Sequence, residues 1–288
     1  MDINNTRPAY KRQRFLLAFI HQLGGGISSN DLQKLVFLHT MKGEADFYEF
    51  LPYKFGAYSF QLAADIDILH RAGFLATDGA RVWALGDYAR ENLFDIASER
   101  GNRLIRKAYR EYPYYTINSE LIERLFRGDE SARFFGERQK YIQAGQILFT
   151  IGYEGRGIEA FINDLIQNGV KLLCDVRRNA LSRKFGFSGG KLERIAGMVG
   201  IKYVHMPALG IEPDKRAALE TAEHYASLFS AYGKTLPSLD GHLEYIYALL
   251  SSHARIALMC YEREAPMCHR HVIRDYLKKA HEIRSMDL

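Results

Sequence analysis

Residues 256–270 read IALMCYEREAPMCHR, and the C-terminal half of the chain is organised around them. Its first four residues are apolar without interruption, which is typical of a parallel strand that is covered on both faces. Two cysteines follow, together with Glu262, His269 and Arg270. Because loops converge at the carboxyl ends of parallel strands, α/β domains usually carry their site there. We therefore expect a functional site directly after this strand.

Two other apolar runs end in the same way. The run at residues 147–151 leads into GYEGR at residues 152–156, and the run at residues 170–173 leads into three charged residues. These charged residues are Asp175, Arg177 and Arg178. Three predicted strand ends thus carry polar, mostly charged side chains of both signs. We expect them to meet in space, because neighbouring parallel strands end at one edge of the sheet.

Strands and helices alternate from residue 147 onward. We expect strands at residues 147–151, 171–175, 203–205 and 256–260, and helices at residues 158–168, 191–199, 239–251 and 269–283. A helical and loop-rich insertion separates Gly210 from Pro237. The alternation predicts an α/β fold, with a parallel sheet that is covered by helices on both faces. This domain is expected to occupy residues 146–288.

The first 95 residues follow a different pattern. Apolar side chains at helical spacing predict three helices, and the turn Asp78-Gly79 between two short apolar runs predicts a hairpin. The helices are expected at residues 7–23, from about residue 30 onward, and at residues 59–69. Three helices and a hairpin are the order of a winged helix-turn-helix, and residues 31–38 and 52–59 resemble the small winged-helix-like domains of antitoxin and defence-associated proteins. We predict a mostly helical winged-helix domain over residues 1–95.

This N-terminal domain has two possible tasks. In the first, its third helix contacts DNA, and Lys54, Arg71 and Arg81 are available to the phosphate backbone, although Asp65 and Asp67 would repel phosphates. In the second, it is a protein interaction module, since a fold does not by itself specify a function.

The segment between the two domains, residues 96–145, is predicted to be a helical linker region. Helical patterning extends over residues 87–143 and is broken at Pro113. Basic residues recur on one helical face, followed by a Tyr-rich stretch at residues 112–115. The basic residues are Arg103, Arg106, Lys107 and Arg110. Such a face can bind a single strand by charge and stacking. Alternatively, it is solvated and the tyrosines pack against the next domain.

Length and composition restrict the broad class of the protein. A chain of 288 residues favours two domains, and no apolar run reaches the roughly 18 residues of a membrane span. The first residues lack the apolar core of a secretory signal, and three cysteines at no disulfide-like spacing fit a reducing compartment, so we expect a cytoplasmic protein without membrane association. The net charge of +5 permits a polyanionic partner without requiring one.

Four sequence blocks in the C-terminal half resemble the DUF488 family. They are TIGYEGR at residues 150–156, DVRRNALSR at 175–183, YVHMPALG at 203–210, and CYE at 260–262 with CHR at 268–270. Ala180 stands where relatives commonly have proline. The resemblance implies a Rossmann-like α/β domain, and relatives occur in the setting of DNA modification, repair and defence.

Arginines dominate the predicted strand-end clusters. Arg156, Arg177, Arg178 and Arg270 could hold a phosphate or carboxylate, since guanidinium groups bind oxyanions in a bidentate way. Asp175 and Glu262 would limit the mutual repulsion of these arginines. The structural alternative is a buried network of Asp175 with Arg177 or Arg270 that ties the strand ends together.

The remaining residues of these clusters suggest catalytic and binding roles. Glu262 is the first choice for a general base that activates water, and Asp175 is the second. Tyr153 can stack on a base or donate a hydrogen bond. Gly152 and Gly155 would let backbone amides approach the ligand. Cys268 and His269 are expected to contact the substrate.

The sulfur-containing residues leave two alternatives open. A zinc site at Cys260, Cys268 and His269 would need a fourth ligand, and the sequence lacks the Cys-x-x-Cys spacing of many zinc sites. The candidates for that ligand are Cys174, His205 and Glu262. A thiolate nucleophile at Cys268 is the second alternative, because a helix N-terminus and arginines lower a thiol pKa. The residue pattern leads us to assign no metal and no cofactor.

Together these features predict a hydrolase that processes DNA or nucleotides. The reaction would be cleavage of an N-glycosidic bond, as in a DNA glycosylase, or of a phosphodiester. Base removal is favoured because it needs an acid, an aromatic platform and arginines, whereas a metal-dependent nuclease would ordinarily show more carboxylates. The rival hypothesis is a non-catalytic regulator that binds a nucleic acid or nucleotide and responds through the winged helix.

Overall fold

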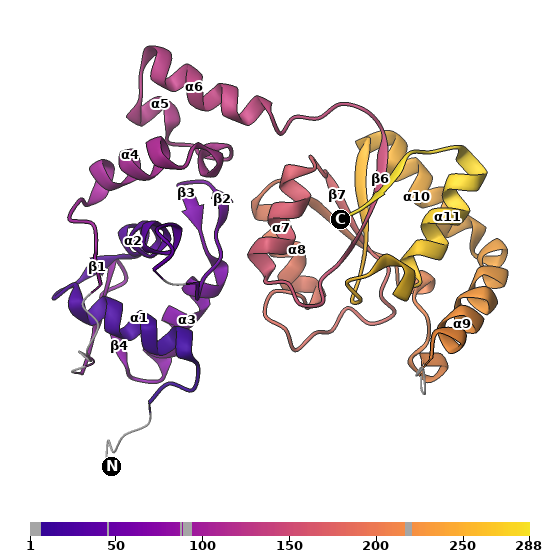
Figure 1. Ribbon diagram of the computed structural model, residues 1–288, viewed down its shortest axis with the longest axis horizontal. Helices are drawn as coiled ribbons and strands as arrows, with labels where there is room; N and C mark the ends of the chain where they lie inside the picture. Colours follow the sequence, from indigo (N-terminus) through magenta and orange to yellow (C-terminus); the bar gives the residue numbers. More distant parts are fainter. Residues whose placement is uncertain (1–6, 45, 87, 89–93, 217–220) are drawn as a thin grey trace. The chain divides into compact units, whose positions relative to one another are not determined.

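The computed structural model describes residues 7–44, 46–86, 88, 94–216 and 221–288, and the chain forms two compact units, Met1–Gln139 and Lys140–Leu288 (Figure 1). Each unit has its own hydrophobic core. Among the described helices, none is both long and apolar enough to cross a bilayer.

The second unit contains a five-stranded sheet in which all neighbouring strands are parallel. Its strands are β6 (Ile147–Gly152), β7 (Leu172–Asp175), β8 (Lys202–His205), β9 (Arg255–Cys260) and β10 (Ser285–Asp287). The predicted parallel sheet is therefore confirmed, with one addition. Strand β10 was not predicted, and it pairs with β6 at the edge of the sheet.

The described residues of the second unit form five α-helices. They are α7 (Ile158–Gln167), α8 (Gly189–Met198), α9 (Ala222–Thr235), α10 (Asp240–His253) and α11 (Arg270–His281), of which α9 packs against α11. Helices α7 and α8 lie on one face, and α10 and α11 lie on the other (Figure 1). Within the predicted insertion between Gly210 and Pro237, residues 217–220 lie outside the described residues, and α9 follows them.

Successive residues of each strand face opposite sides of the sheet. Leu172 and Cys174 of β7 belong to the core that contains α10 and α11, so Leu173 and Asp175 face the side of α7 and α8. The strand order is β10-β6-β9-β7-β8, which places β9 between β6 and β7. The carboxyl ends of β6, β9 and β7, which were expected to meet, are therefore neighbours at the same end of the sheet.

The first unit begins with three helices and a small antiparallel sheet. The helices are α1 (Lys11–Gln22), α2 (Ser29–Met41) and α3 (Phe60–Arg71), and the sheet order β1-β5-β4 joins β1 (Ile27–Ser28), β5 (Arg81–Ala84) and β4 (Leu75–Thr77). Ser28 caps α2 by accepting a hydrogen bond from the Asp31 amide. A hairpin of β2 (Leu51–Tyr53) and β3 (Gly56–Tyr58) was not predicted.

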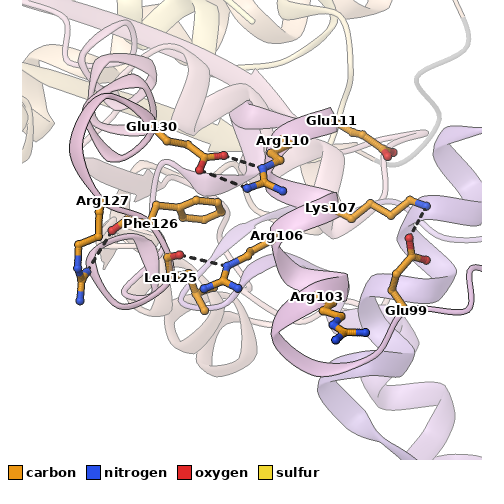
Figure 2. A pocket seen from close by; sticks show the side chains of 10 residues that line it. All are labelled: Glu99, Arg103, Arg106, Lys107, Arg110, Glu111, Leu125, Phe126, Arg127 and Glu130. Carbon is orange, nitrogen blue, oxygen red and sulfur yellow. Dashed lines mark hydrogen bonds and ion pairs between the residues drawn. The ribbon is translucent and has the colours of Figure 1, made fainter.

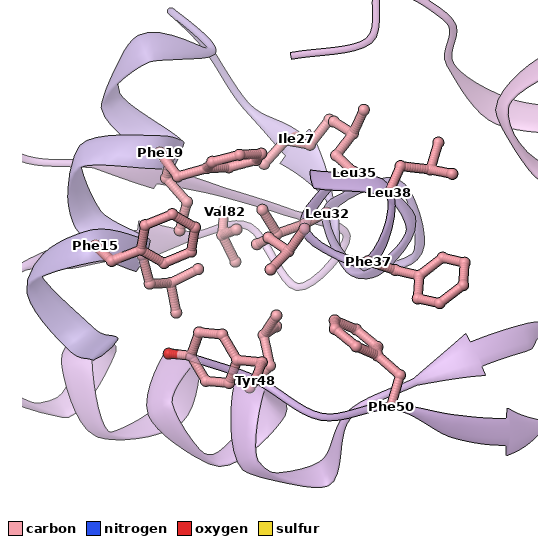
Figure 3. Close-up of a cluster of buried hydrophobic side chains, with 14 of the residues drawn as sticks. Phe15, Phe19, Ile27, Leu32, Leu35, Phe37, Leu38, Tyr48, Phe50 and Val82 are labelled. Atoms are coloured by element: carbon pink, nitrogen blue, oxygen red, sulfur yellow. The ribbon is translucent and has the colours of Figure 1, made fainter. Parts of the chain in front are cut away.

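Aromatic and aliphatic side chains from α1, α2 and the hairpins fill the core of this part (Figure 3). Asp65 of α3 lies fully buried and accepts hydrogen bonds from Arg12, Gln13 and Tyr48. It is therefore a core residue, and the expected repulsion of DNA phosphates by Asp65 is wrong.

Helices α4 (Gly101–Glu111), α5 (Ile122–Leu125) and α6 (Gly128–Gln139) complete the first unit. The predicted break at Pro113 is confirmed, because α4 ends at Glu111 and a 3-10 helix, η1 (Pro113–Thr116), follows. Tyr112 and Tyr115 pack edge-on against Phe37 of α2. Residues 87 and 89–93 of the predicted helical segment lie outside the described residues.

Candidate functional site

A buried ion pair ties the end of β7 together. Asp175 has no exposed surface, and its carboxylate accepts hydrogen bonds from Arg177 Nε at 2.8 Å and Arg177 Nη2 at 2.5 Å. The Arg177 amide and the Tyr203 hydroxyl also donate to this carboxylate, at 3.1 and 2.6 Å. Burial opposes the charge of Arg177, but the hydrogen bonds and charge of Asp175 outweigh it and raise the pKa of Arg177. Asp175 therefore fixes its neighbours, and its carboxylate is already occupied.

The same arginine links β7 to the end of β6. Arg177 Nη1 donates to the Tyr153 hydroxyl and to the Phe187 carbonyl, both at 3.0 Å. The Tyr153 ring stacks on Phe187 with centroids 4.3 Å apart, and the Tyr261 ring meets it edge-on at 5.3 Å. Because Phe187 covers a face of Tyr153, the more exposed ring of Tyr261 is the better platform for a ligand base.

A cavity of about 390 Å³ opens above these strand ends. Its lining includes Tyr153 after β6, Arg177 and Arg178 after β7, and Cys260 and Tyr261 at the end of β9. His269, Asn179, Leu181, Ile211 and Pro213 also line it. Three strand ends thus contribute to a single cavity, at the place where α/β domains commonly bind ligands.

The four predicted phosphate-binding arginines have different surroundings. Arg178 lines the cavity, is 42% exposed and pairs with Glu212 at 2.8 Å. Arg156 pairs with Asp164 of α7, and its side chain is only 16% exposed. Arg270 is buried, and its guanidinium donates to the carbonyls of residues 262 and 263 and to Thr150 Oγ1. Among these arginines, Arg178 is the one best placed to reach a ligand.

The loop that carries Glu262 is held in place by its backbone. Arg270 binds the Glu262 carbonyl, and that same carbonyl lies so close to Gly152 that a Cβ there would be 1.8 Å away. Gly152 is therefore required for backbone packing between β6 and this loop. Gly155 has a φ of +73°, so it serves the turn after β6 through a conformation that favours glycine. Glu262 itself is partly exposed, directly after Tyr261.

A sulfur–imidazole cluster lies on the floor of the cavity. The Nδ1 atom of His269 is 3.8 Å from the Sγ atoms of both Cys260 and Cys268, and all three residues are buried. Burial, followed by the neighbouring Cys260, raises the pKa of Cys268 to about 12. The expectation that a helix N-terminus and arginines lower the pKa of this thiol is therefore wrong. Cys174, His205 and Glu262 do not belong to this cluster among the described residues.

The first unit holds a second, mildly basic pocket of about 760 Å³ between α4, α5 and α6 (Figure 2). The residues that line it are Glu99, Arg103, Arg106, Lys107, Arg110, Glu111, Leu125, Phe126, Arg127 and Glu130. Glu130 and Glu99 form ion pairs with Arg110 and Lys107, and Figure 2 draws no interaction for Arg103. The basic face predicted from the sequence is therefore a pocket, while the tyrosines that follow it are packed against α2.

Several residues of the cavity and of the network beside it had no predicted role. Tyr261 stood only in a motif, although its ring is exposed and lines the cavity. Tyr203 stood in a predicted strand and in a motif of the family resemblance, although its hydroxyl binds Asp175. Asn179 sits beside Arg178 in the motif DVRRNALSR, which was the available signal. Phe187 carried no signal, because its role depends on how the loop at residues 177–190 folds back.

Comparison with known families supports the resemblance of the C-terminal half. The family model "Domain of unknown function DUF488" matches residues 157–277, within the second unit. The motif at residues 150–156 lies directly before this range, and the first unit lies outside it. No curated protein and no solved structure matches the chain. The family description assigns no activity.

Proposed function

Taking residues 157–277 as a DUF488 domain, we propose that the protein is a hydrolase acting on DNA or on a nucleotide, and that the reacting nucleotide binds in the cavity above β6, β9 and β7. One observation carries this proposal: the cavity places Arg178 and the exposed ring of Tyr261 around a floor built on rigid strands. An arginine suits a phosphate, and an exposed aromatic ring suits a base.

Each residue has a distinct role in this scheme. Arg178 binds the phosphate, because its pair with Glu212 is half exposed and can exchange for a ligand. Tyr261 stacks on the base. Glu262 is not among the residues that line the cavity, but it directly follows Tyr261, which does, and its loop is fixed by Arg270 and by the close contact with Gly152. In this scheme its partly exposed carboxylate accepts the proton of the attacking water. Asp175 is a positioning residue, because four hydrogen bonds already occupy its carboxylate.

The reaction we favour is removal of a base by cleavage of its N-glycosidic bond. The cavity of about 390 Å³ has the size range of small-molecule sites, which suits one extruded nucleotide. A phosphodiester is the second candidate bond. We further propose that the sheet is Rossmann-like, and that α1 to α3 with the β4-β5 hairpin form a winged helix.

The basic pocket of the first unit supports the nucleic-acid part of the proposal. Its arginines and lysine can contact phosphates without reading the base sequence. Bound there, DNA would be held at a high local concentration near the second unit, since both units belong to one chain. If the second unit proves inactive, this pocket instead supports a regulator that binds nucleic acid without processing it.

The test is incubation of the full chain with labelled single- and double-stranded DNA that carries normal, damaged or modified bases. Breaks that appear only after mild alkali indicate base removal, and direct breaks indicate phosphodiester cleavage. We expect Glu262→Gln to lower the rate at least about 100-fold, the usual contribution of a positioned acid or base.

Glu264→Gln is the matched control, because Glu264 lies on the same loop with its side chain 75% exposed. This control variant should retain the wild-type rate. DNA binding without any product would leave only the regulator, and equal rates for the Glu262→Gln variant and the wild type would remove Glu262 from the mechanism.

A further inference from the structure

Three potential metal ligands meet beneath the cavity. Cys260 ends β9, whereas Cys268 and His269 immediately precede α11. Their ligand atoms all lie within 4.8 Å of one another, and each residue is at most 1% exposed. Cys260 and His269 also line the cavity. The cluster is therefore buried on one side and borders a ligand-sized space on the other.

The imidazole of His269 is oriented toward the two sulfurs. Its Nε2 atom lies 3.0 Å from the Val176 carbonyl, which can only accept a hydrogen bond. Nε2 therefore carries the proton, and the lone pair of Nδ1 points to the two Sγ atoms, each 3.8 Å away. Metal-binding histidines are usually held in this way, with the second ring nitrogen donating to a carbonyl or carboxylate.

The distances between these atoms suit a tetrahedral ion. With Zn–N near 2.0 Å and Zn–S near 2.3 Å, neighbouring ligand atoms of a tetrahedral zinc site are roughly 3.6 Å apart. The observed nitrogen–sulfur separations of 3.8 Å need only a small contraction. Two thiolates and a neutral imidazole would also cancel the charge of Zn²⁺. A neutral complex is favourable here, because Cys260 and Cys268 belong to the apolar core of the unit.

We propose that Cys260, Cys268 and His269 bind a zinc ion and leave its fourth position open to the cavity. Binding releases the two thiol protons to solvent, and the ion is held by the two sulfurs and by Nδ1. The sequence argued against this site because it lacks a Cys-x-x-Cys pair. The fold supplies the ligands differently, by bringing a strand end and the start of a helix together.

An open coordination position has a chemical consequence that rests on the proposed function. Three protein ligands and one exchangeable position are the arrangement of catalytic zinc sites, in which bound water becomes a hydroxide near neutral pH. Such a hydroxide would attack the sugar carbon of the nucleotide held in the cavity, and the bond from this carbon to the base would break. Glu262 would accept the proton of the zinc-bound water and pass it to the departing base.

The first experiment measures zinc directly. We expect the full chain, purified in a reducing buffer without chelator, to contain about one zinc per chain and to compete with a chromophoric chelator. Cys260→Ser and Cys268→Ser should each weaken zinc binding by more than about 100-fold. Loss of a residue that only hydrogen-bonds to a metal ligand already costs up to about 100-fold, and these substitutions remove a ligand itself. Cys174→Ser is the matched control, because Cys174 is a buried cysteine of the same core outside the cluster. This variant should keep its zinc.

A second measurement protects the test against variants that fail to fold. The wild-type chain loaded with Co²⁺ should show a thiolate-to-cobalt charge-transfer band, and added azide should shift its visible spectrum if the fourth position is open. A wild-type chain that binds neither ion, or that binds zinc equally after Cys268→Ser, overturns the site. If azide leaves the visible spectrum of the cobalt-loaded chain unchanged, the proposal that the fourth coordination position is open is wrong.

The outcomes for zinc and for hydrolysis can be told apart. Zinc binding without any hydrolysis keeps the metal site and ends the proposed hydrolase. Hydrolysis that persists at the full rate in zinc-free protein keeps the hydrolase and removes zinc from its mechanism. Loss of activity on zinc removal, with recovery when zinc is returned, supports both.

Discussion

The two basic regions of this protein differ in what surrounds their charges. At the strand ends of the second unit, Arg177 is buried and its partners are fixed: the carboxylate of Asp175, a tyrosine hydroxyl and a carbonyl. In the pocket of the first unit, Arg110 and Lys107 pair with carboxylates that are themselves partly exposed. Buried charges depend on every partner, whereas exposed charges are screened by water and salt. Substitutions should therefore affect folding in the first case and binding in the second.

The largest effect is expected from Asp175→Asn. The amide cannot neutralise Arg177, which would remain as an uncompensated buried charge, and such losses cost about 3–5 kcal/mol of unfolding free energy. Hydrogen exchange followed by mass spectrometry should show faster exchange in β6, β7 and β9. Trp83, the single tryptophan of the chain, lies in the first unit. Its fluorescence should therefore show that the first unit unfolds at the same denaturant concentration in the variant and in the wild type.

Asp275→Asn is the matched control for this change. Its side chain is 55% exposed and pairs with Arg274 at 2.8 Å, so the cost should stay below about 1 kcal/mol. If both variants lost stability equally, burial would not be what distinguishes the two kinds of charge.

The comparison also explains what the sequence could and could not predict. Apolar runs revealed β6, β7 and β9, and polar residues after them located the site, because burial on both faces leaves a clear pattern. Strand β10 has the short polar sequence Ser-Met-Asp, so its pairing with β6 left no pattern to read. Asp175 and Arg177 lie two residues apart, which made a network between them foreseeable. Arg270 binds Thr150 Oγ1 and two backbone carbonyls, and because every residue carries such a carbonyl, the sequence could not separate Arg270 from Arg178.

The first unit contains a buried cation whose hydrogen-bond partners, among the described residues, include no carboxylate. Lys34 of α2 is almost fully buried, and its Nζ donates to the Ala57 carbonyl at 2.8 Å and to Asn30 Oδ1 at 3.2 Å. Burial lowers the pKa of Lys34 to about 7, although the charge of Asp31 acts in the opposite direction. Burial disfavours the charge of both Lys34 and Arg177, yet the pKa of Lys34 is lowered and the pKa of Arg177 is raised, because only Arg177 binds a carboxylate.

This lowered pKa makes the stability of the first unit depend on pH. Above pH 7 the folded state loses the Lys34 proton, while the unfolded state keeps it until about pH 10.4. The free energy of unfolding should therefore rise with pH in this window, by up to about 1.4 kcal/mol per pH unit. Below the window Lys34 is protonated in both states, so folding must bury its charge. Lys34→Met should lack this rise. Urea unfolding monitored by Trp83 fluorescence at pH 7, 8 and 9 measures it, and equal slopes for both proteins would contradict the assignment.

The smallest effect on folding is expected in the basic pocket, where Arg103→Ala should change stability by no more than about 0.5 kcal/mol. Its effect should appear in binding instead. If Arg103 contacts a phosphate, the substitution weakens the binding of single-stranded DNA equally for every sequence. It also reduces the magnitude of the slope of log affinity against log salt by about one. Fluorescence anisotropy at several salt concentrations measures both quantities. Arg124→Ala removes the same charge from an exposed position on the neighbouring helix α5. A matching loss in that control would mean that net charge, and not the pocket, attracts the nucleic acid.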